Sequence, residues 1–367
     1  MILLGTWVIL ILLGLLNGKN RYILFFQAVF VIFMMGMLNI YTVDHPARLY
    51  NFNILQHNPA FIFSGNWGYQ LFNYILGRFV SFEVTMFILS LLGVLILIKS
   101  ISRYSQLKSE IFALYMLTPF VIDVTQIKNF FAMSIWLYFS YYIVSPPKEN
   151  SLIKNSIIYI LGIFLVGSFH SAFYITLFFV IVPYISIFKS SVIALLAITL
   201  GNAIPNLMNI LVSTFGNYLP TVVVSKYYAY KAVLNLDIIK TRETMIISFF
   251  ILFIFAITPY ILQIKNNQVV RDSILVNNII KINILALISL PLLSFSTEFY
   301  RLQRNLLILV YIVVLQSDQN IAFGHRFKIR ISKVWGVIFA IILAFFYLYV
   351  DTIRWNFESV FQALFRF

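Results

Sequence analysis

Long runs of apolar residues, separated by short polar stretches, fill this chain almost from end to end. A run such as 334–350 (VWGVIFAIILAFFYLYV) is close to one bilayer core in helical length, since a helix rises roughly 1.5 Å per residue and the hydrocarbon is about 30 Å thick. Apolar residues make up 61% of the chain and charged residues only 10%, and the mean hydropathy is +0.93. These values exclude a soluble protein and predict an integral membrane protein.

The spanning segments are predicted to be helices, because hydrocarbon offers no partner for backbone N–H and C=O groups. Strands of a membrane barrel would alternate in polarity over about ten residues, whereas these runs are continuously apolar. We therefore predict an all-α, polytopic helical bundle, a single integral membrane domain over residues 1–367 with about twelve transmembrane helices. The predicted spans are 2–17, 22–40, 84–98, 110–124, 128–144, 153–168, 172–188, 191–212, 244–264, 274–295, 302–316 and 334–350.

Two longer polar segments, 41–66 and 213–243, are predicted to lie outside the membrane. Between the first of them and the third span, apolar residues recur at helical spacing opposite Asn73 and Arg78. This pattern predicts a helix near 67–80 that lies in the plane of the interface, with aromatic residues as anchors.

The formal net charge of +14 is explained by the preference of cytoplasmic loops for Lys and Arg. More than half of the 26 basic residues fall in one alternate set of loops, from Lys19 to Lys333, which we predict to be cytoplasmic. No nucleic-acid motif accompanies the charge, so no nucleic-acid partner is expected. The opposite, outer set still carries Arg48, Lys128 and Arg301, each among other polar residues at a helix end. Such cations suit an anionic ligand at the outer face.

The first polar cluster runs from Asp44 to Tyr50 (DHPARLY) after the second span. Pro46 in a first helical turn would place Asp44 and His45 at the helix N-terminus and Arg48 one turn further on. The helix dipole also favours a carboxylate there, so a purely structural role stays open beside a functional acid and arginine.

The second cluster, DVTQIKN, forms the turn between the fourth and fifth predicted spans. Asp123 and Lys128 could form an ion pair that closes this turn. Alternatively, Gln126, Lys128 and Asn129 could point into a polar cavity.

The third candidate is His170, in the tight junction GSFHSA between two spans. A single histidine at a helix end is more often hydrogen-bonded structure than a catalyst, although its imidazole titrates near neutral pH. The outer tyrosines Tyr227 and Tyr228, which lie among lysines, suit sugars and phosphates, but interfacial anchoring explains them equally well.

The fourth cluster opens the span at 302–316. Glu298, Arg301 and Asn305 share one helical face, with Arg304 at its edge. A charge in the centre of a span costs about 2.5–3.5 kcal/mol on insertion scales, so this face predicts function more than a simple Glu–Arg pair.

Several absences limit the chemistry. The chain has no cysteine, no acid-x-acid pair, no glycine-rich phosphate loop and no closely spaced histidines. We therefore expect neither a metal site nor a cofactor.

Five motifs in order along the chain carry a resemblance to a known family: Asp44…Arg48-x-Tyr50, Gly68-Tyr69-Gln70-Leu71-Phe72-Asn73, Gln126-Ile127-Lys128-Asn129-Phe130-Phe131-Ala132, Phe169-His170-Ser171-Ala172 and Glu298-x-x-Arg301-x-x-Arg304. Together they resemble the EpsG family of Wzy-type polysaccharide polymerases, over most of the chain. Lys128 departs from the pattern, since family members usually carry an arginine there; lysine keeps the charge but loses the planar bidentate fork. Asn66 stands near a position where the family often has an acid.

The resemblance implies a multi-pass glycosyltransferase of the bacterial cytoplasmic (inner) membrane, with its active site on the outer side. It would polymerise undecaprenyl-pyrophosphate-linked oligosaccharide units into an O-antigen, capsule or exopolysaccharide, without a metal, because lipid pyrophosphate is a good leaving group. Its partners would be the lipid bilayer, a flippase and a chain-length regulator. The residues assigned to the site are the pyrophosphate-binding Arg48, Lys128, Arg301 and Arg304, the catalytic candidates Asp44, His170 and Glu298, and the substrate-binding Tyr50, Gln126, Asn129, Tyr227 and Tyr228.

Other functions remain as alternatives. A flippase or other transporter of the same lipid-linked unit would be expected to show paired repeats and broken helices at mid-membrane, and the sequence shows no repeat. A membrane O-acyltransferase would depend on a deeply placed histidine, and only His170 lies near a span. An O-antigen ligase uses the same donor at the same face, so the sequence does not separate it from a polymerase.

Overall fold

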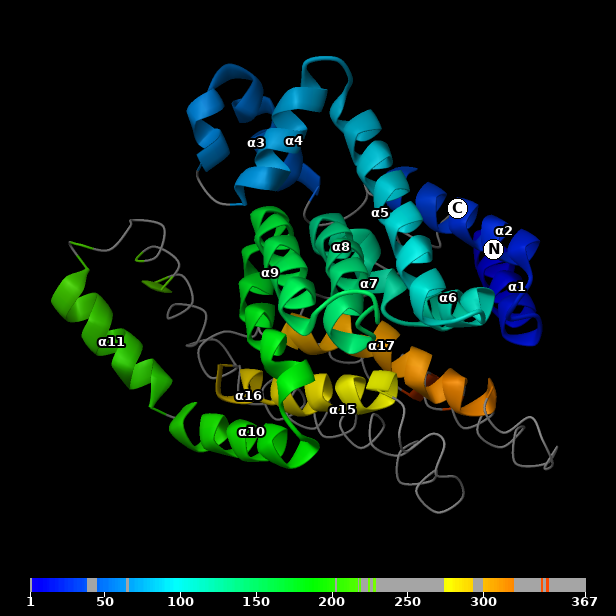
Figure 1. Ribbon diagram of the computed structural model, residues 1–367. Coiled ribbons are helices and arrows are strands. Elements are labelled where there is room, and N and C mark those ends of the chain that lie inside the picture. Colours follow the sequence, from blue (N-terminus) through cyan, green and yellow to red (C-terminus); the bar gives the residue numbers. More distant parts are fainter. Residues whose placement is uncertain are drawn as a thin grey trace. The chain divides into compact units, whose positions relative to one another are not determined.

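The computed structural model describes residues 2–37, 45–63, 66–201, 203–216, 274–292 and 300–319, with a few isolated positions elsewhere (Figure 1). Regular structure in these ranges is helical, and no strand occurs among them. The described residues form two compact units. One contains the chain up to Val180 together with described residues from Leu307 onward, and the other contains those between Ile181 and Leu306.

The helices of the first unit are α1 (Ile2–Leu16), α2 (Arg21–Met37), α3 (His45–His57), η2 (Pro59–Phe63), α4 (Trp67–Gly77), α5 (Phe82–Tyr104), α6 (Lys108–Leu117), α7 (Phe120–Thr125), α8 (Ile127–Val144), α9 (Leu152–Phe169) and most of the 3₁₀ helix η3 (Ser171–Tyr184). Those of the second are α10 (Ile187–Gly201), α11 (Ile204–Phe215), α15 (Ile274–Ala286) and α16 (Ser289–Leu292). Helix α17 (Tyr300–Gln319) begins in the second unit and ends in the first.

Three described segments are long and apolar enough to cross a membrane: α5, α9 and the stretch Ile274–Leu292. Capping defines where α5 and α9 begin. The hydroxyl oxygens of Ser81 and Ser151 accept hydrogen bonds from the backbone N–H groups of Val84 and Lys154, at 3.4 and 3.2 Å. The predicted spans at 84–98 and 153–168 are therefore confirmed as long apolar helices.

Some predicted spans are not single α-helices. Proline lacks an N–H donor and clashes with the preceding turn. The span predicted at 110–124 accordingly breaks at Thr118–Pro119 into α6 and α7, and that at 191–212 breaks ahead of Pro205 into α10 and α11. The span predicted at 172–188 is the 14-residue 3₁₀ helix η3. A 3₁₀ helix rises about 2.0 Å per residue, so even this short element extends roughly 28 Å.

The predicted total of about twelve spans stays a prediction. The span at 244–264 and nearly all of that at 334–350 lie outside the described residues. Besides the three long segments, α1, α2, η3 and α10 are shorter apolar helices.

The core of the first unit is built on α5, α8 and α9. Helices α5 and α8 run in the same direction and are joined by two hydrogen bonds. The Ser100 hydroxyl donates to the Ser134 carbonyl at 3.3 Å. One turn further along both helices, the Tyr104 phenol donates to the Leu137 carbonyl at 3.1 Å. Gly93 permits close approach, because a Cβ there would lie 2.6 Å from the ring of Phe130. Helix α2 covers another side of α5, and α9 packs along α8.

Helices α3, η2 and α4 form a layer at one end of this core (Figure 1). The amphipathic stretch predicted near 67–80 is helix α4, and the outer segment 41–66 contains α3 and η2. Figure 1 shows α3 and α4 beyond the ends of α8 and α9. The Gln56 side-chain amide donates to the Asn73 carbonyl at 3.4 Å and joins α3 to α4, while the rings of Phe52 and Phe82, 5.3 Å apart, join α3 to α5.

Candidate functional site

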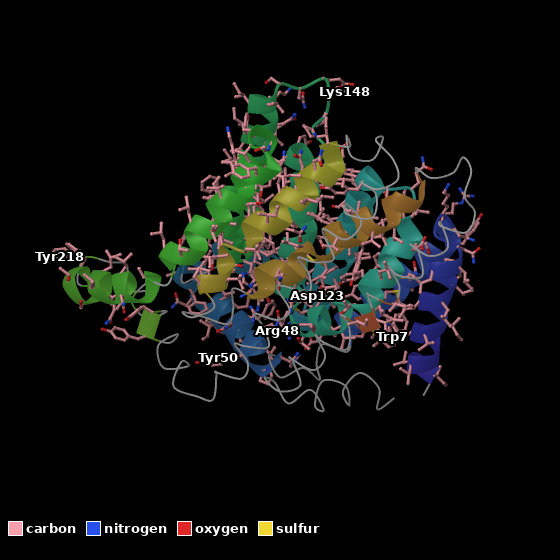
Figure 2. All side chains as sticks on the ribbon, turned by 90° about the horizontal axis from the view of Figure 1, so that it is seen from below. Trp7, Arg48, Tyr50, Asp123, Lys148 and Tyr218 are labelled. Atoms are coloured by element: carbon pink, nitrogen blue, oxygen red, sulfur yellow. The ribbon has the colours of Figure 1, made fainter. Side chains whose placement is uncertain are left out.

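The candidate site begins with the antiparallel packing of α8 and α9, which brings the start of one helix beside the end of the other. Lys128 lies in the first turn of α8, and His170 directly follows the last residue of α9. Lys148, in the connecting loop, lies beyond the other end of α8, about 25 Å along a helix of that length. Figure 2 shows Lys148 far from Arg48.

Three aromatic rings hold α4 against this end of the helix pair. Phe72 of α4, Phe131 of α8 and Phe169 of α9 form a triangle with centroid separations of 6.3, 6.5 and 4.9 Å. Each aromatic pair adds about 0.5–1.5 kcal/mol beyond its buried area. Each ring comes from a different one of the motifs that carry the family resemblance, so the structure brings three of those motifs together.

Two polar or close contacts then fix the beginning of α4. The side-chain oxygen of Asn66 accepts a hydrogen bond from the backbone N–H of Ser171 at 2.8 Å. Gly68 lies so close to α9 that a Cβ on it would be 2.1 Å from the Ser168 hydroxyl oxygen and 2.8 Å from the Ser168 Cβ. Only glycine allows this approach, and the first turn of α4 is therefore tied to the segment that contains His170.

Tyr69 follows Gly68 and meets the cation of α8. The ammonium nitrogen of Lys128 lies 5.6 Å from the centroid of the Tyr69 ring, within range of a cation–π interaction. Burial raises the pKa of the Tyr69 phenol, so the phenol is neutral near pH 7. The Asn73 side chain and the charge of Arg48 act on this pKa in the opposite direction. The sequence suggested only an anchoring role for the aromatic residues of this helix. The one signal that Tyr69 could belong to the site was its position inside a family-like motif.

Arg48 lies on α3, on the same helical face as buried Phe52. Its charge acts on the pKa of Tyr69 and on that of His45, which is lowered first by burial and then by Arg48. The prediction that a helix starts at His45 is confirmed, whereas Asp44 lies outside the described residues. Tyr50 is 67% exposed, two positions beyond Arg48 and so on the other side of α3 (Figure 2).

The turn before α8 is polar and buried. Asp123, whose side chain is fully buried, accepts a hydrogen bond from the Tyr115 phenol at 3.3 Å, a partner that the sequence did not suggest. Gln126 separates α7 from α8, and its backbone N–H donates to the Asp123 carbonyl at 3.0 Å. Asn129, one residue after Lys128, is buried.

His170 is buried and hydrogen-bonded, as expected for a residue at a helix end. Its backbone N–H donates to the Val166 carbonyl at 3.0 Å, and its Nδ1 accepts from the backbone N–H of Ala172 at 3.3 Å. With Nδ1 as an acceptor, a neutral imidazole carries its proton on Nε2.

The remaining predicted residues belong to other parts of the chain. The Tyr227 phenol donates to the Asn209 side chain at 2.6 Å, and its ring is 5.4 Å from that of exposed Tyr228, both in the second unit. Arg301 and Arg304 occupy the first turns of α17, and Arg304 is only 2% exposed. A guanidinium so deeply buried is stable only when it is paired. Glu298 lies outside the described residues.

Long apolar helices and polar residues gathered at helix ends define an α-helical membrane protein. The model of the EpsG family matches residues 21–361, nearly the whole chain. The chain therefore belongs to the EpsG family, and with it to the membrane proteins of polysaccharide biosynthesis, as the motifs indicated. Searches of curated proteins and of solved structures gave no match.

Proposed function

We propose that this protein is a Wzy-like polymerase that joins undecaprenyl-pyrophosphate-linked oligosaccharide units into a surface polysaccharide at the outer face of the cytoplasmic membrane. A hydroxyl oxygen of the new unit attacks the anomeric carbon of the growing chain. The bond from that carbon to the pyrophosphate oxygen breaks, and lipid pyrophosphate leaves with the electron pair. The hydroxyl proton passes to a base, and no atom changes its oxidation state. A metal is not obligatory, because lipid pyrophosphate is a good leaving group.

The observation that carries this proposal is the meeting of three family-like motifs at one end of the α8–α9 pair. It places a cation, Lys128, and an imidazole, His170, at the same helix ends. That end lies opposite the loop with Lys148, which the charge bias predicts to be cytoplasmic. A site at this end would therefore face outward, where a lipid-linked sugar would be used.

The pyrophosphate calls for fixed positive charge, because negative charge develops on its oxygen as the glycosidic bond breaks. Lys128, half-buried over the Tyr69 ring, supplies one such charge. Arg48, whose charge reaches the same ring, supplies another. Arg301 and Arg304 of α17 are further pyrophosphate ligands in this proposal, with the guanidinium fork that suits phosphate.

The base is assigned among Glu298, His170 and Asp44. Because the Nδ1 of His170 already accepts a hydrogen bond, its neutral ring offers Nε2–H as a donor. This N–H can donate a hydrogen bond to the departing pyrophosphate oxygen, but it cannot accept the proton of the attacking hydroxyl. We therefore assign proton removal to Glu298. His170 acts as a hydrogen-bond donor to the leaving group, and Asp44 orients a cation.

The test is gel analysis of the surface glycan in a strain that lacks the gene, complemented with variants. The deletion should leave a single repeat unit on the cell surface, and the wild-type gene should restore the ladder. Lys128→Gln should give only single units, whereas Lys128→Arg should restore long chains because the charge is kept. Lys154→Gln, an exposed lysine at the far end of α9, is the matched control and should behave as wild type.

Other results would point to the alternatives. Loss of all surface glycan in the deletion would indicate a flippase, and long chains stranded on the lipid carrier would indicate a ligase. Normal long chains in the deletion, or in Arg301→Ala, would remove the polymerase assignment for the protein or for that residue, respectively. A flippase and a chain-length regulator are the proteins that we expect to act with it.

A further inference from the structure

Asn73 is a buried amide with an unmet acceptor. Asn73 is 3% exposed, and its side-chain oxygen has no hydrogen-bond partner among the residues that the structure describes. Leaving such an acceptor unpaired costs about 1–3 kcal/mol in general, so a donor is expected to reach it.

The position of Asn73 on α4 places its side chain close to the proposed pyrophosphate-binding cation, Lys128. Asn73 follows Tyr69 by one helical turn, so both side chains share a face of α4. Tyr69 on this face stacks under the Lys128 ammonium. The side chain of Asn73 acts on the pKa of the Tyr69 phenol, and its own carbonyl oxygen is the open group of this face.

The Tyr69 hydroxyl proton is only weakly engaged. It points to the Met86 sulfur at 3.9 Å, and a thioether is a poor acceptor that a sugar oxygen can replace. The face next to Lys128 thus offers one acceptor, on Asn73, and one donor, on Tyr69.

We propose that Asn73 and Tyr69 form a sugar subsite, which binds the saccharide attached to the pyrophosphate beside Lys128; this inference rests on the proposed function. The ionised pyrophosphate has no hydrogen-bond donor, and the isoprenoid tail has neither donor nor acceptor. In a lipid-linked oligosaccharide, only the sugar carries the hydroxyl or amide N–H that the Asn73 oxygen needs. Its ring or hydroxyl oxygens accept from Tyr69.

Binding measurements on the full-length protein in lipid nanodiscs separate the sugar from the rest of the substrate. Two probes are used: undecaprenyl pyrophosphate alone, and undecaprenyl pyrophosphate with its repeat unit, extracted from the deletion strain. Asn73→Leu should bind the sugar-bearing probe about tenfold more weakly, the size expected for one hydrogen bond to a buried group, and should bind the bare lipid as wild type does.

Two further variants make the test independent of any folding defect in Asn73→Leu. Tyr69→Phe keeps the ring under Lys128, so it too should weaken only the sugar-bearing probe, while Lys128→Gln should weaken both probes. Asn53→Leu, at an exposed position on α3, is the matched control and should change neither.

Each contrary outcome is distinct. Equal weakening of both probes by Asn73→Leu and Tyr69→Phe would assign these residues to the pyrophosphate and overturn the sugar subsite. Unchanged binding in both variants would mean that an ordered water satisfies Asn73, and would also overturn it, with the proposed function intact. If the wild-type protein bound neither probe, the proposed function itself would fail and this inference with it.

Discussion

Replacing Gly68 by alanine should disable the protein by moving α4, without touching any group that could contact substrate. The added Cβ would lie 2.8 Å from the Ser168 Cβ and 3.1 Å from the Ser168 backbone carbonyl carbon. Carbon atoms in contact are normally about 3.5–4.0 Å apart, so the first turn of α4 must withdraw by roughly 1 Å. Rotating the Ser168 hydroxyl does not help, because its Cβ and backbone remain in place.

That displacement moves Tyr69, the next residue, away from its place under Lys128, and it stretches the hydrogen bond from Ser171 to Asn66. Overpacking of this kind costs about 1–3 kcal/mol of stability, which a folded protein can tolerate. A shift of about 1 Å in an active site can reduce a rate on the order of 100-fold. We therefore expect chain growth to fall by about that factor while the protein level stays near normal.

The assay is the rate of chain growth in membrane vesicles supplied with lipid-linked units, read as the glycan ladder on a gel. Ser168→Gly in the Gly68→Ala background removes the two clashing side-chain atoms and should recover much of the rate, a non-additive result. Gly5→Ala, which meets nothing within 4 Å, should be neutral. A Gly68→Ala protein with the wild-type rate would refute the view that the α4–α9 contact positions the site.

Two other predictions concern stability. Phe131→Ala should lower the melting temperature in detergent, since removing a buried phenylalanine costs about 3–5 kcal/mol, and Phe25→Ala, at a 61% exposed position, should change it little. The pKa of His45 is lowered from 6.5 by burial and by Arg48, with Glu83 acting in the opposite direction. The unfolded chain therefore takes up this proton first as the pH falls, so stability present above pH 6.5 is lost on acidification. His45→Gln should flatten this part of the melting-temperature profile between about pH 7 and 5, and an unchanged profile would contradict the assignment.

Much of the local structure could be predicted from the sequence. The long apolar stretches within α5 and α9 were evident, and so was the amphipathic helix that became α4. The breaks at Pro119 and Pro205 were also present as local signals, but the length of the apolar runs suggested continuous helices. The 3₁₀ form of η3 has no comparable signal, since an apolar run reads the same for either helix type.

The site was predictable only in part. Lys128 and His170 could be selected because polar residues at the ends of apolar segments are costly and therefore informative. Tyr69 and Asn73 could not be ranked in the same way, since aromatic and amide residues are ordinary in an interfacial helix. Their significance depends on which face of α4 meets α8, and helical periodicity within α4 does not contain that information.

The sequence by itself determined that this protein lies in a lipid bilayer and that its secondary structure is helical. Both follow from local quantities: apolar length, the need to pair every backbone N–H and C=O in hydrocarbon, and the scarcity of charge. The tertiary structure decided which polar residues share a site. Gly68 touches Ser168, Asn66 binds Ser171 and Tyr69 meets Lys128 only because α4 is clamped by rings from two distant helices. Contacts between residues so far apart in the chain depend on side-chain packing in three dimensions, which composition and periodicity do not encode.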